Sequence, residues 1–373
     1  MSTPSLSVVG VVREANVNWR RDTPSRYRFS IQGKGMMDAE ELNRRLTLFC
    51  KSHLEDAGAE VTGVQRAPGH AGFSYVFQVK SRGLTESYVI RLPPPGVKLE
   101  GTADVMRQVR ALQALEGTDV PRPPLVWWGE DPEWFGTPYF VTRKLEGQTL
   151  APEGIGWLKG TPPEVRRRMA EQAMTALAGI HRIDWEQKAR PLGPPLDLAM
   201  DVMRWERFRE RAAEPEAMVL GPKVRDGLLE RLPGKTQVGM FHGDYQWSNL
   251  LYGTDGTLLA VLDWELVGIG AVLNDLGWIL TFSDPRAWAL PEALFGAGVL
   301  PGPEDLLGMY ARASGSEPRD VAWFRALAAY KFAVITGFNL MLHRRGKRHD
   351  PEWEVLKDSI PTLLAYALEC LGG

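Results

Sequence analysis

The spacing of apolar residues changes along the first 95 positions and predicts one helix followed by two strands. Between Asp38 and Gly58, apolar residues recur every three or four positions, which is typical of an amphipathic helix with Asp38 as its N-cap. Apolar and smaller or polar residues then alternate over 73–79, and a second strand-like run follows at 88–90. Because Arg82-Gly83 lies between these two runs, we expect a β-hairpin there.

The remaining pattern divides the chain near Gly147 into a mixed part and a mainly helical part. Before Gly147 we expect a helix over 103–115 and strands at 125–128 and 139–143, which together predict a small antiparallel sheet carrying one helix. After it the pattern is helical, notably over 163–183, and is interrupted by short apolar runs at 250–252 and 258–262. The sequence thus predicts an α+β fold with three parts: an N-terminal extension (1–37), a first lobe (38–147) and a second lobe (148–373).

Composition places the chain among folded globular proteins and limits its partners. Its 373 residues carry 44 Lys and Arg against 46 Asp and Glu, so no basic field is available for nucleic acid or an anionic membrane. The two cysteines, Cys50 and Cys370, have no zinc-like or disulfide-framework spacing, and we expect a reducing cytoplasm. The longest apolar stretch, 329–342, is shorter than the roughly 20 residues of a membrane span and is expected to be a buried helix.

The residues that suggest chemistry gather in two neighbouring segments. Residues 241–249 read Phe-His-Gly-Asp-Tyr-Gln-Trp-Ser-Asn, and a hairpin-like stretch leads from them to Asp-Trp-Glu at 263–265. Phosphoryl transfer from Mg-ATP requires a carboxylate to accept the proton of the attacking hydroxyl, and an Asp and an Asn to hold the metal. The Asp-x4-Asn spacing followed by a second Asp is typical of kinase catalytic and metal loops, so we predict a phosphotransferase.

These motifs closely resemble the aminoglycoside phosphotransferase and choline-kinase-like family, in particular the branch associated with acyl-CoA dehydrogenases. Further segments that resemble the family are 88–94, 120–123, 136–141, 146–147 and 180–185. The resemblance implies a protein-kinase-like bilobal fold, with a nucleotide-binding N-terminal lobe built on a small antiparallel sheet and a mostly helical C-terminal lobe for catalysis and acceptor binding. It also implies ATP and Mg²⁺ as cofactors.

The resemblance assigns roles to individual residues of the two loops. Asp244 resembles the catalytic base, and Asn249 and Asp263 resemble the magnesium ligands. His242 resembles the residue that braces the catalytic loop, and Asp275 the Asp that caps and anchors it.

The expected phosphate-binding residues depart from the kinase pattern. Gly69, Gly72 and Ser74 occupy the loop between the first two strands, where backbone N–H groups could cover the phosphates. Arg91 stands where a protein kinase has its strand lysine, and Gln108 stands where the bracing Glu is expected on the following helix. Arg91 still offers a bidentate phosphate contact, but a neutral Gln can only form a hydrogen bond with it, so we expect no ion pair between these two positions.

The sequence leaves the acceptor open. The basic segment 343–349 favours an anionic or neutral acceptor, such as a hydroxyacyl-CoA, although Arg and Lys at a helix end also simply complement its dipole. Trp247, inside the catalytic loop, is a candidate wall for an apolar substrate. The alternatives are an aminoglycoside or macrolide antibiotic kinase and a catalytically silent nucleotide-binding scaffold. We expect a small hydroxylated molecule as partner, neither nucleic acid nor membrane, and make no prediction of oligomeric state.

Overall fold

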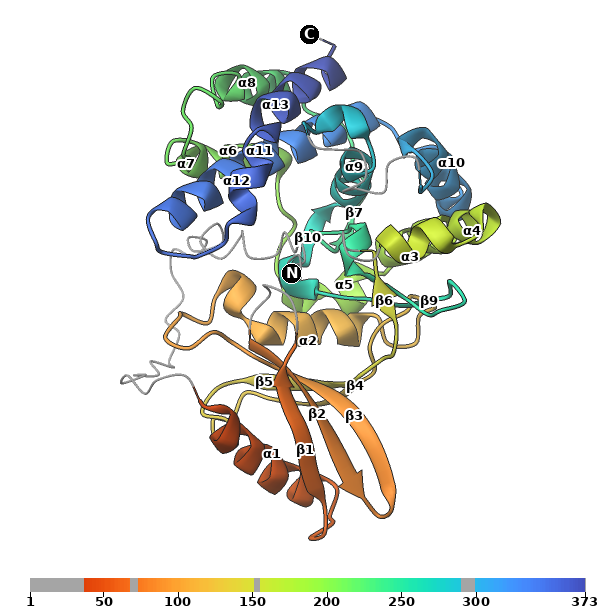
Figure 1. Ribbon diagram of the computed structural model, residues 1–373. Coiled ribbons are helices and arrows are strands. Elements are labelled where there is room, and N and C mark those ends of the chain that lie inside the picture. Colours follow the sequence, from red (N-terminus) through yellow and green to blue (C-terminus); the bar gives the residue numbers. More distant parts are fainter. Residues whose placement is uncertain (1–36, 68–72, 151–154, 290–298, 373) are drawn as a thin grey trace.

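The chain folds into two lobes with a helix between them (Figure 1). The computed structural model describes residues 37–67, 73–150, 155–289 and 299–372. One lobe contains a five-stranded antiparallel sheet in the order β1-β2-β3-β5-β4. The other is mainly helical, so the predicted bilobal α+β class is confirmed. The five strands are β1 (Glu60–Arg66), β2 (Phe73–Ser81), β3 (Leu84–Leu92), β4 (Leu125–Gly129) and β5 (Tyr139–Arg143).

Helix α1 (Ala39–His53) covers one face of this sheet. It begins where the sequence predicts, because the Asp38 carboxylate accepts the Glu41 N–H at 2.7 Å and so satisfies one free donor of the first turn. Its apolar stripe, including Leu46 and Phe49, packs against buried strand residues such as Phe77. Burying this stripe against the sheet is the main stabilisation of an amphipathic helix of this length.

The β2–β3 hairpin turns at the predicted dipeptide. Arg82 and Gly83 both have positive φ, 50° and 81°, as a two-residue turn that follows the right-handed strand twist requires. The turn places Ser74 opposite Arg91 in the strand register, near the open end of the hairpin. Two residues predicted to contact phosphate therefore lie side by side. Gly69 and Gly72, predicted for the same site, lie outside the described residues.

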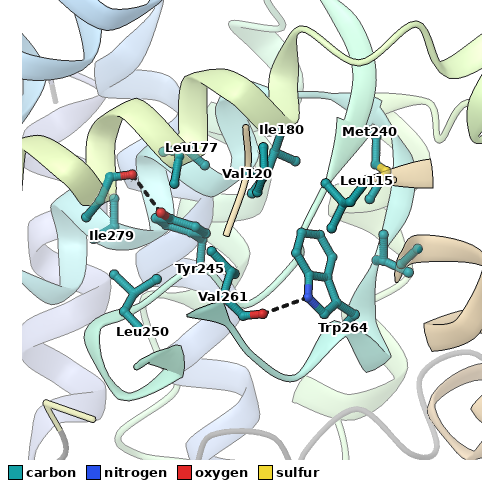
Figure 2. Packing of buried hydrophobic residues seen from close by; sticks show 14 of the residues in the cluster. Leu115, Val120, Leu177, Ile180, Met240, Tyr245, Leu250, Val261, Trp264 and Ile279 are labelled. Atoms are coloured by element: carbon teal, nitrogen blue, oxygen red, sulfur yellow. Dashed lines mark hydrogen bonds between the residues drawn. The ribbon is translucent and has the colours of Figure 1, made fainter. Parts of the chain in front are cut away.

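Helix α2 (Val105–Ala114) lies between the sheet and the helical lobe (Figure 1). Its buried residues join a large apolar cluster formed mostly by the C-terminal lobe. Figure 2 shows the centre of this cluster, where Tyr245 and Trp264 pack among aliphatic side chains and the Trp264 indole donates to the Val261 carbonyl at 3.0 Å. The apolar core is thus continuous across the lobe boundary.

The C-terminal lobe surrounds two small sheets with helices. Strands β7 (Val238–Phe241) and β10 (Gly268–Ala271) pair antiparallel, and β6 (Gln148–Thr149), β8 (Leu250–Tyr252) and β9 (Leu258–Val261) form the second sheet. The helices are α3 (Ile155–Gly160), α4 (Pro163–His181), α5 (Trp185–Lys188), α6 (Leu198–Met203), α7 (Glu206–Arg209), α8 (Gly221–Glu230), α9 (Leu273–Phe282), α10 (Pro303–Ser314), α11 (Val321–Arg344), α12 (Glu352–Leu356) and α13 (Ser359–Cys370).

Helix α11 is the central helix of this lobe. Among the described residues it alone is long and apolar enough to cross a membrane by length and composition, but 83% of its most apolar 18-residue window is buried inside the protein. It packs against α9 and α13. The two polar residues singled out in the sequence have internal partners: the Lys331 ammonium lies 2.5 Å from the Asp201 carboxylate, and the Asn339 amide donates to the Ile335 carbonyl. The expectation of a buried helix is confirmed.

A second polar cluster ties α7 to α8 and α11. The Glu206 carboxylate accepts hydrogen bonds from Arg209, from Arg225 at 2.6 Å and from the Tyr330 hydroxyl. Burial alone raises the pKa of a carboxyl group, but these hydrogen bonds outweigh it and hold the pKa of Glu206 below its usual value. The cluster therefore stabilises the fold only while Glu206 is ionised.

Candidate active site

Two adjacent loops carry the predicted catalytic residues. The first, residues 242–249, connects β7 to β8, and the second, residues 262–267, connects β9 to β10. They are hydrogen-bonded to one another, since the Leu262 N–H donates to the Asn249 carbonyl at 2.8 Å. We call them the catalytic loop and the metal loop. The β-hairpin fold of the intervening segment therefore brings together the side chains that the sequence predicts to cooperate.

Asp275, near the N-terminus of α9, fixes the start of the catalytic loop. One carboxylate oxygen accepts the His242 N–H at 2.6 Å and the other accepts the Gly243 N–H at 2.8 Å. The carboxylate is 1% exposed, so neither bond competes with water. The geometry is the anchoring arrangement that the resemblance implies for this residue.

Gly243 allows the two loops to approach one another. Its φ is 89°, a backbone conformation that favours glycine, and a Cβ atom at this position would lie 2.4 Å from the Leu266 carbonyl oxygen. That oxygen belongs to the backbone of the metal loop and cannot rotate away. A side chain here would therefore push the catalytic loop off the metal loop.

His242 connects the loops through its ring. Its Nε2 lies 2.8 Å from the Leu262 carbonyl, and its Nδ1 lies 3.2 Å from the backbone N–H of Asp244. A carbonyl can only accept and an N–H can only donate, so Nε2 carries the proton and Nδ1 accepts. The ring also packs 4.6 Å from that of Trp264. His242 thus occupies a bracing position beneath Asp244.

Asp244 lies buried at the centre of the site. Its Oδ1 accepts hydrogen bonds from Gln246 and from the Trp278 indole, each at 2.9 Å. Its Oδ2 accepts, within the part of the chain that the structure describes, only the Asn249 amide, also at 2.9 Å. Burial raises the pKa of Asp244 to about 6, and the hydrogen bonds from Gln246 and Asn249 oppose this rise. Because a carboxylate oxygen accepts about two bonds, Oδ2 keeps capacity for an incoming hydroxyl.

Asp263, at the start of the metal loop, is one of the two residues predicted to bind Mg²⁺. Its backbone is left-handed, with φ 61° and ψ 67°, a conformation that is uncommon for non-glycine residues but that Asp adopts more readily than most. Its Oδ1 is buried and accepts no hydrogen bond from the described residues. The described chain contains no cluster of three or more His, Cys, Asp or Glu side chains arranged for a metal. An Asp and an Asn completed by phosphate and water oxygens is, however, the donor set that Mg²⁺ prefers.

Arg91 forms its ion pair with the metal loop and not with helix α2. As the sequence predicts, it has no ion-pair partner at position 108. It pairs instead with Glu265 of the metal loop at 2.5 Å, lies 3.8 Å from the Asp263 carboxylate and 3.4 Å from the Ser74 hydroxyl. Arg91 could only donate to Gln108 Oε1, and among the described residues its side chain donates to Ser74 and Glu265 instead. The brace of Arg91 therefore comes from the C-terminal lobe.

Sequence reasoning missed three residues that contact the catalytic groups: Glu265, Trp278 and Gln246. The signal for Glu265 was its position two residues after Asp263, and that for Gln246 was its position two residues after Asp244. Trp278 gave none, because an indole on an apolar helix reads as core.

Two acceptor-side expectations change in the structure. Trp247 is buried in the apolar core and its indole donates to the Ser283 hydroxyl at 3.0 Å, so it packs inside the protein. In the basic segment 343–349, Arg344 is held by Glu354 and Glu214, each at 2.7 Å. Its charge is therefore already compensated, which weakens the case for this segment as an anion site.

Comparison with known proteins agrees with the fold and the loops. A family model described as the phosphotransferase enzyme family matches residues 64–324, which include both loops. The chain belongs to this family.

Two kinds of curated protein are among the relatives of this chain. Human acyl-CoA dehydrogenase family member 11 is 24% identical over 310 residues, covering 79% of this chain and 38% of the relative. The chain therefore spans well under half the length of this relative. Viomycin phosphotransferase of Streptomyces vinaceus is 30% identical over 195 residues, covering 49% of this chain and 62% of the relative.

Solved structures share the fold. A Ralstonia eutropha chain, itself only provisionally assigned as an aminoglycoside phosphotransferase, superposes with a TM-score of 0.72 at 21% identity, covering 88% of this chain and 98% of that one. The GDP complex of aminoglycoside 2'-phosphotransferase-IIIa superposes with a TM-score of 0.58 at 15% identity, with the same coverage. At these identities the likeness establishes the kinase-like fold and leaves the acceptor open.

Proposed function

We propose that the protein is a small-molecule kinase that transfers the γ-phosphate of Mg-ATP to a hydroxyl group. The observation that carries this proposal is the arrangement of Asp244, whose Oδ2 keeps a free acceptor position, beside Asn249 and Asp263. The buried Oδ1 of Asp263 accepts no hydrogen bond from the described residues and lies 3.8 Å from the Arg91 guanidinium. A base, a metal-ligand pair and a cationic phosphate contact are the parts that phosphoryl transfer requires.

Each residue has a defined task in this reaction. Asp244 orients the acceptor hydroxyl through Oδ2 and takes its proton, for which a pKa of about 6 is suited near neutral pH. Asn249 and Asp263 would hold Mg²⁺, which when bound neutralises charge on the phosphates. Arg91 and Ser74 face the same space from the sheet and would position those phosphates. His242 and Asp275 keep the catalytic loop in place, so most of the catalysis lies in positioning.

The acceptor that we favour is a hydroxyacyl-CoA or a related anionic molecule. The support is the likeness to acyl-CoA dehydrogenase family member 11 over 79% of this chain, because a kinase linked to such an enzyme would act on acyl thioesters. A second candidate is an antibiotic kinase, which the 30% identity to viomycin phosphotransferase favours. A catalytically silent scaffold is disfavoured, because Arg91 has a charged brace in Glu265.

The test is transfer of labelled γ-phosphate from Mg-ATP into a panel of hydroxyacyl-CoAs, free hydroxy acids, aminoglycosides, macrolides and viomycin. Asp244→Asn is the control, and it should lower kcat by about 10²- to 10⁴-fold while Mg-ATP affinity stays within about twofold. A labelled hydroxyacyl-CoA absent from the control supports the favoured acceptor, and labelled viomycin supports the second candidate. Equal turnover by the variant and the wild type would refute the role of Asp244.

A further inference from the structure

Asp275 has a third partner that lies outside both loops. The Nε2 atom of His181, at the end of α4, lies 3.3 Å from the same Asp275 oxygen that accepts the His242 N–H. Both side chains are almost completely buried, at 2% and 1% exposed. His181 touches none of the groups that the proposed reaction uses directly. Its contact with the loop anchor therefore needs its own explanation.

Helix α10 supplies the next contact. The Tyr310 hydroxyl lies 2.7 Å from Nδ1 of His181, and the two rings meet edge to face at 5.6 Å. Tyr310 is also buried, and α10 packs along α4. A continuous chain of contacts thus runs from α10 through α4 to the anchor of the catalytic loop.

The chemistry of these groups fixes which one donates and which one accepts each hydrogen bond. An ionised carboxylate such as that of Asp275 only accepts hydrogen bonds, so Nε2 of His181 must carry a proton and donate it. In a neutral ring Nδ1 is then an acceptor, and the Tyr310 hydroxyl must be the donor. Burial and the nearby Asp275 charge raise the pKa of Tyr310, so this hydroxyl keeps its proton. Tyr310 therefore selects the His181 tautomer that can bind Asp275.

We propose that Tyr310 and His181 are positioning residues for the catalytic loop, acting through Asp275. The proposal rests on the proposed function for its effect on rate. Asp275 holds the two backbone N–H groups that immediately precede Asp244, so a shift of its carboxylate shifts the base. A displacement of about 1 Å in a reacting group can cost about 10²-fold in rate.

The experiment compares two conservative variants. Tyr310→Phe removes the hydroxyl that orients His181. Tyr252→Phe is a matched control. The Tyr252 hydroxyl is also buried and also donates to a carbonyl of α4, that of Met169, at 3.1 Å. Among the described residues it forms no hydrogen bond with His181 or Asp275. We expect Tyr310→Phe to lower kcat about tenfold with the KM for ATP unchanged, and Tyr252→Phe to leave kcat within about twofold.

Hydrogen exchange provides a readout that does not require activity. The His242 and Gly243 amide hydrogens should exchange faster in Tyr310→Phe than in Tyr252→Phe, because only the first variant loosens Asp275. If the wild type phosphorylates nothing in the panel, the proposed function fails while this exchange comparison still decides the proposal. Equal exchange at these amides in the two variants would overturn it.

Rescue at position 181 separates positioning from general packing. In His181→Gln the side-chain amide nitrogen can occupy the place of Nε2 and donate to Asp275, whereas the shorter His181→Asn places its amide near Nδ1. We expect His181→Gln to retain slow exchange at Gly243 and most of kcat, and His181→Asn to lose both. Equal losses in the two variants would show that the ring serves packing alone and would overturn the proposal.

Discussion

The ion pair between Arg91 and Glu265 should contribute measurably to the cohesion of the two lobes. Its partners come from β3 of the sheet and from the metal loop of the C-terminal lobe, with side chains 11% and 1% exposed. At an effective dielectric constant of about 20, two charges about 4 Å apart attract by about 4 kcal/mol. The cost of desolvating each group is common to the single and double variants and cancels in a double-mutant cycle, so we expect a coupling of about 2 to 4 kcal/mol.

A double-mutant cycle measures that coupling. The free energy of unfolding would be obtained from urea titrations of Glu265→Gln, Arg91→Gln and the double variant, without nucleotide, following tryptophan fluorescence. The losses of unfolding free energy in the two single variants should together exceed the loss in the double variant. The reason is that each single variant leaves one buried charge without its principal partner. The same cycle on Glu86 and Arg143 is the control.

The control pair makes the outcome decisive. Glu86 and Arg143 also form an ion pair from the same sheet, but their side chains are 39% and 48% exposed, so a coupling of at most about 1 kcal/mol is expected. A coupling for Glu265 and Arg91 no larger than that of the control pair would refute the argument that Glu265 replaces the missing brace on α2.

Two further predictions concern the loop and the buried carboxylate. Gly243→Ala should lower the free energy of unfolding by about 3 kcal/mol and abolish turnover. Gly315→Ala is the control: Gly315 also has a positive φ, but no atom lies within 4 Å of the added Cβ, so the loss should be only about 1 kcal/mol. Equal losses in urea titrations would exclude the clash with Leu266. Below about pH 4.5 the unfolded chain binds a proton at Glu206 before the folded chain does, so this residue stabilises the protein above that pH and the stabilisation is lost as pH falls. The melting temperature should therefore fall more steeply between pH 6 and pH 3.5 in the wild type than in Glu206→Gln. Parallel curves would contradict the stabilising role of ionised Glu206.

Local patterns predicted most of the elements that position the site. The run 139–143 forms β5 with those same bounds, and Arg82-Gly83 forms the turn of the hairpin. These features depend on residues close in sequence: alternation sets the strands, and positive φ sets the turn. The catalytic and metal loops were predictable for the same reason, since a short hairpin joins them and their spacing is fixed.

Contacts between distant segments were not predictable in this way. Arg91 and Glu265 are 174 positions apart, and Tyr310 and His181 are 129 apart, so no periodicity relates them. Trp247 illustrates the converse problem. Its place inside the catalytic loop suggested a substrate contact, but the loop passes beneath the surface there and the indole packs in the core.

The origin of the Arg91 brace has a consequence for how the site assembles. Where the partner of a phosphate-binding cation lies on a helix of the same lobe, the cation can be oriented whatever the position of the other lobe. Here Glu265 is two residues from Asp263, so the group that orients Arg91 and the group predicted to bind Mg²⁺ lie in one short turn. Arg91 therefore takes its orientation from the metal loop, since the buried, neutral Gln108 on α2 offers it no ion pair. The proposed contact of Arg91 with phosphate thus depends on the packing of the sheet against that loop.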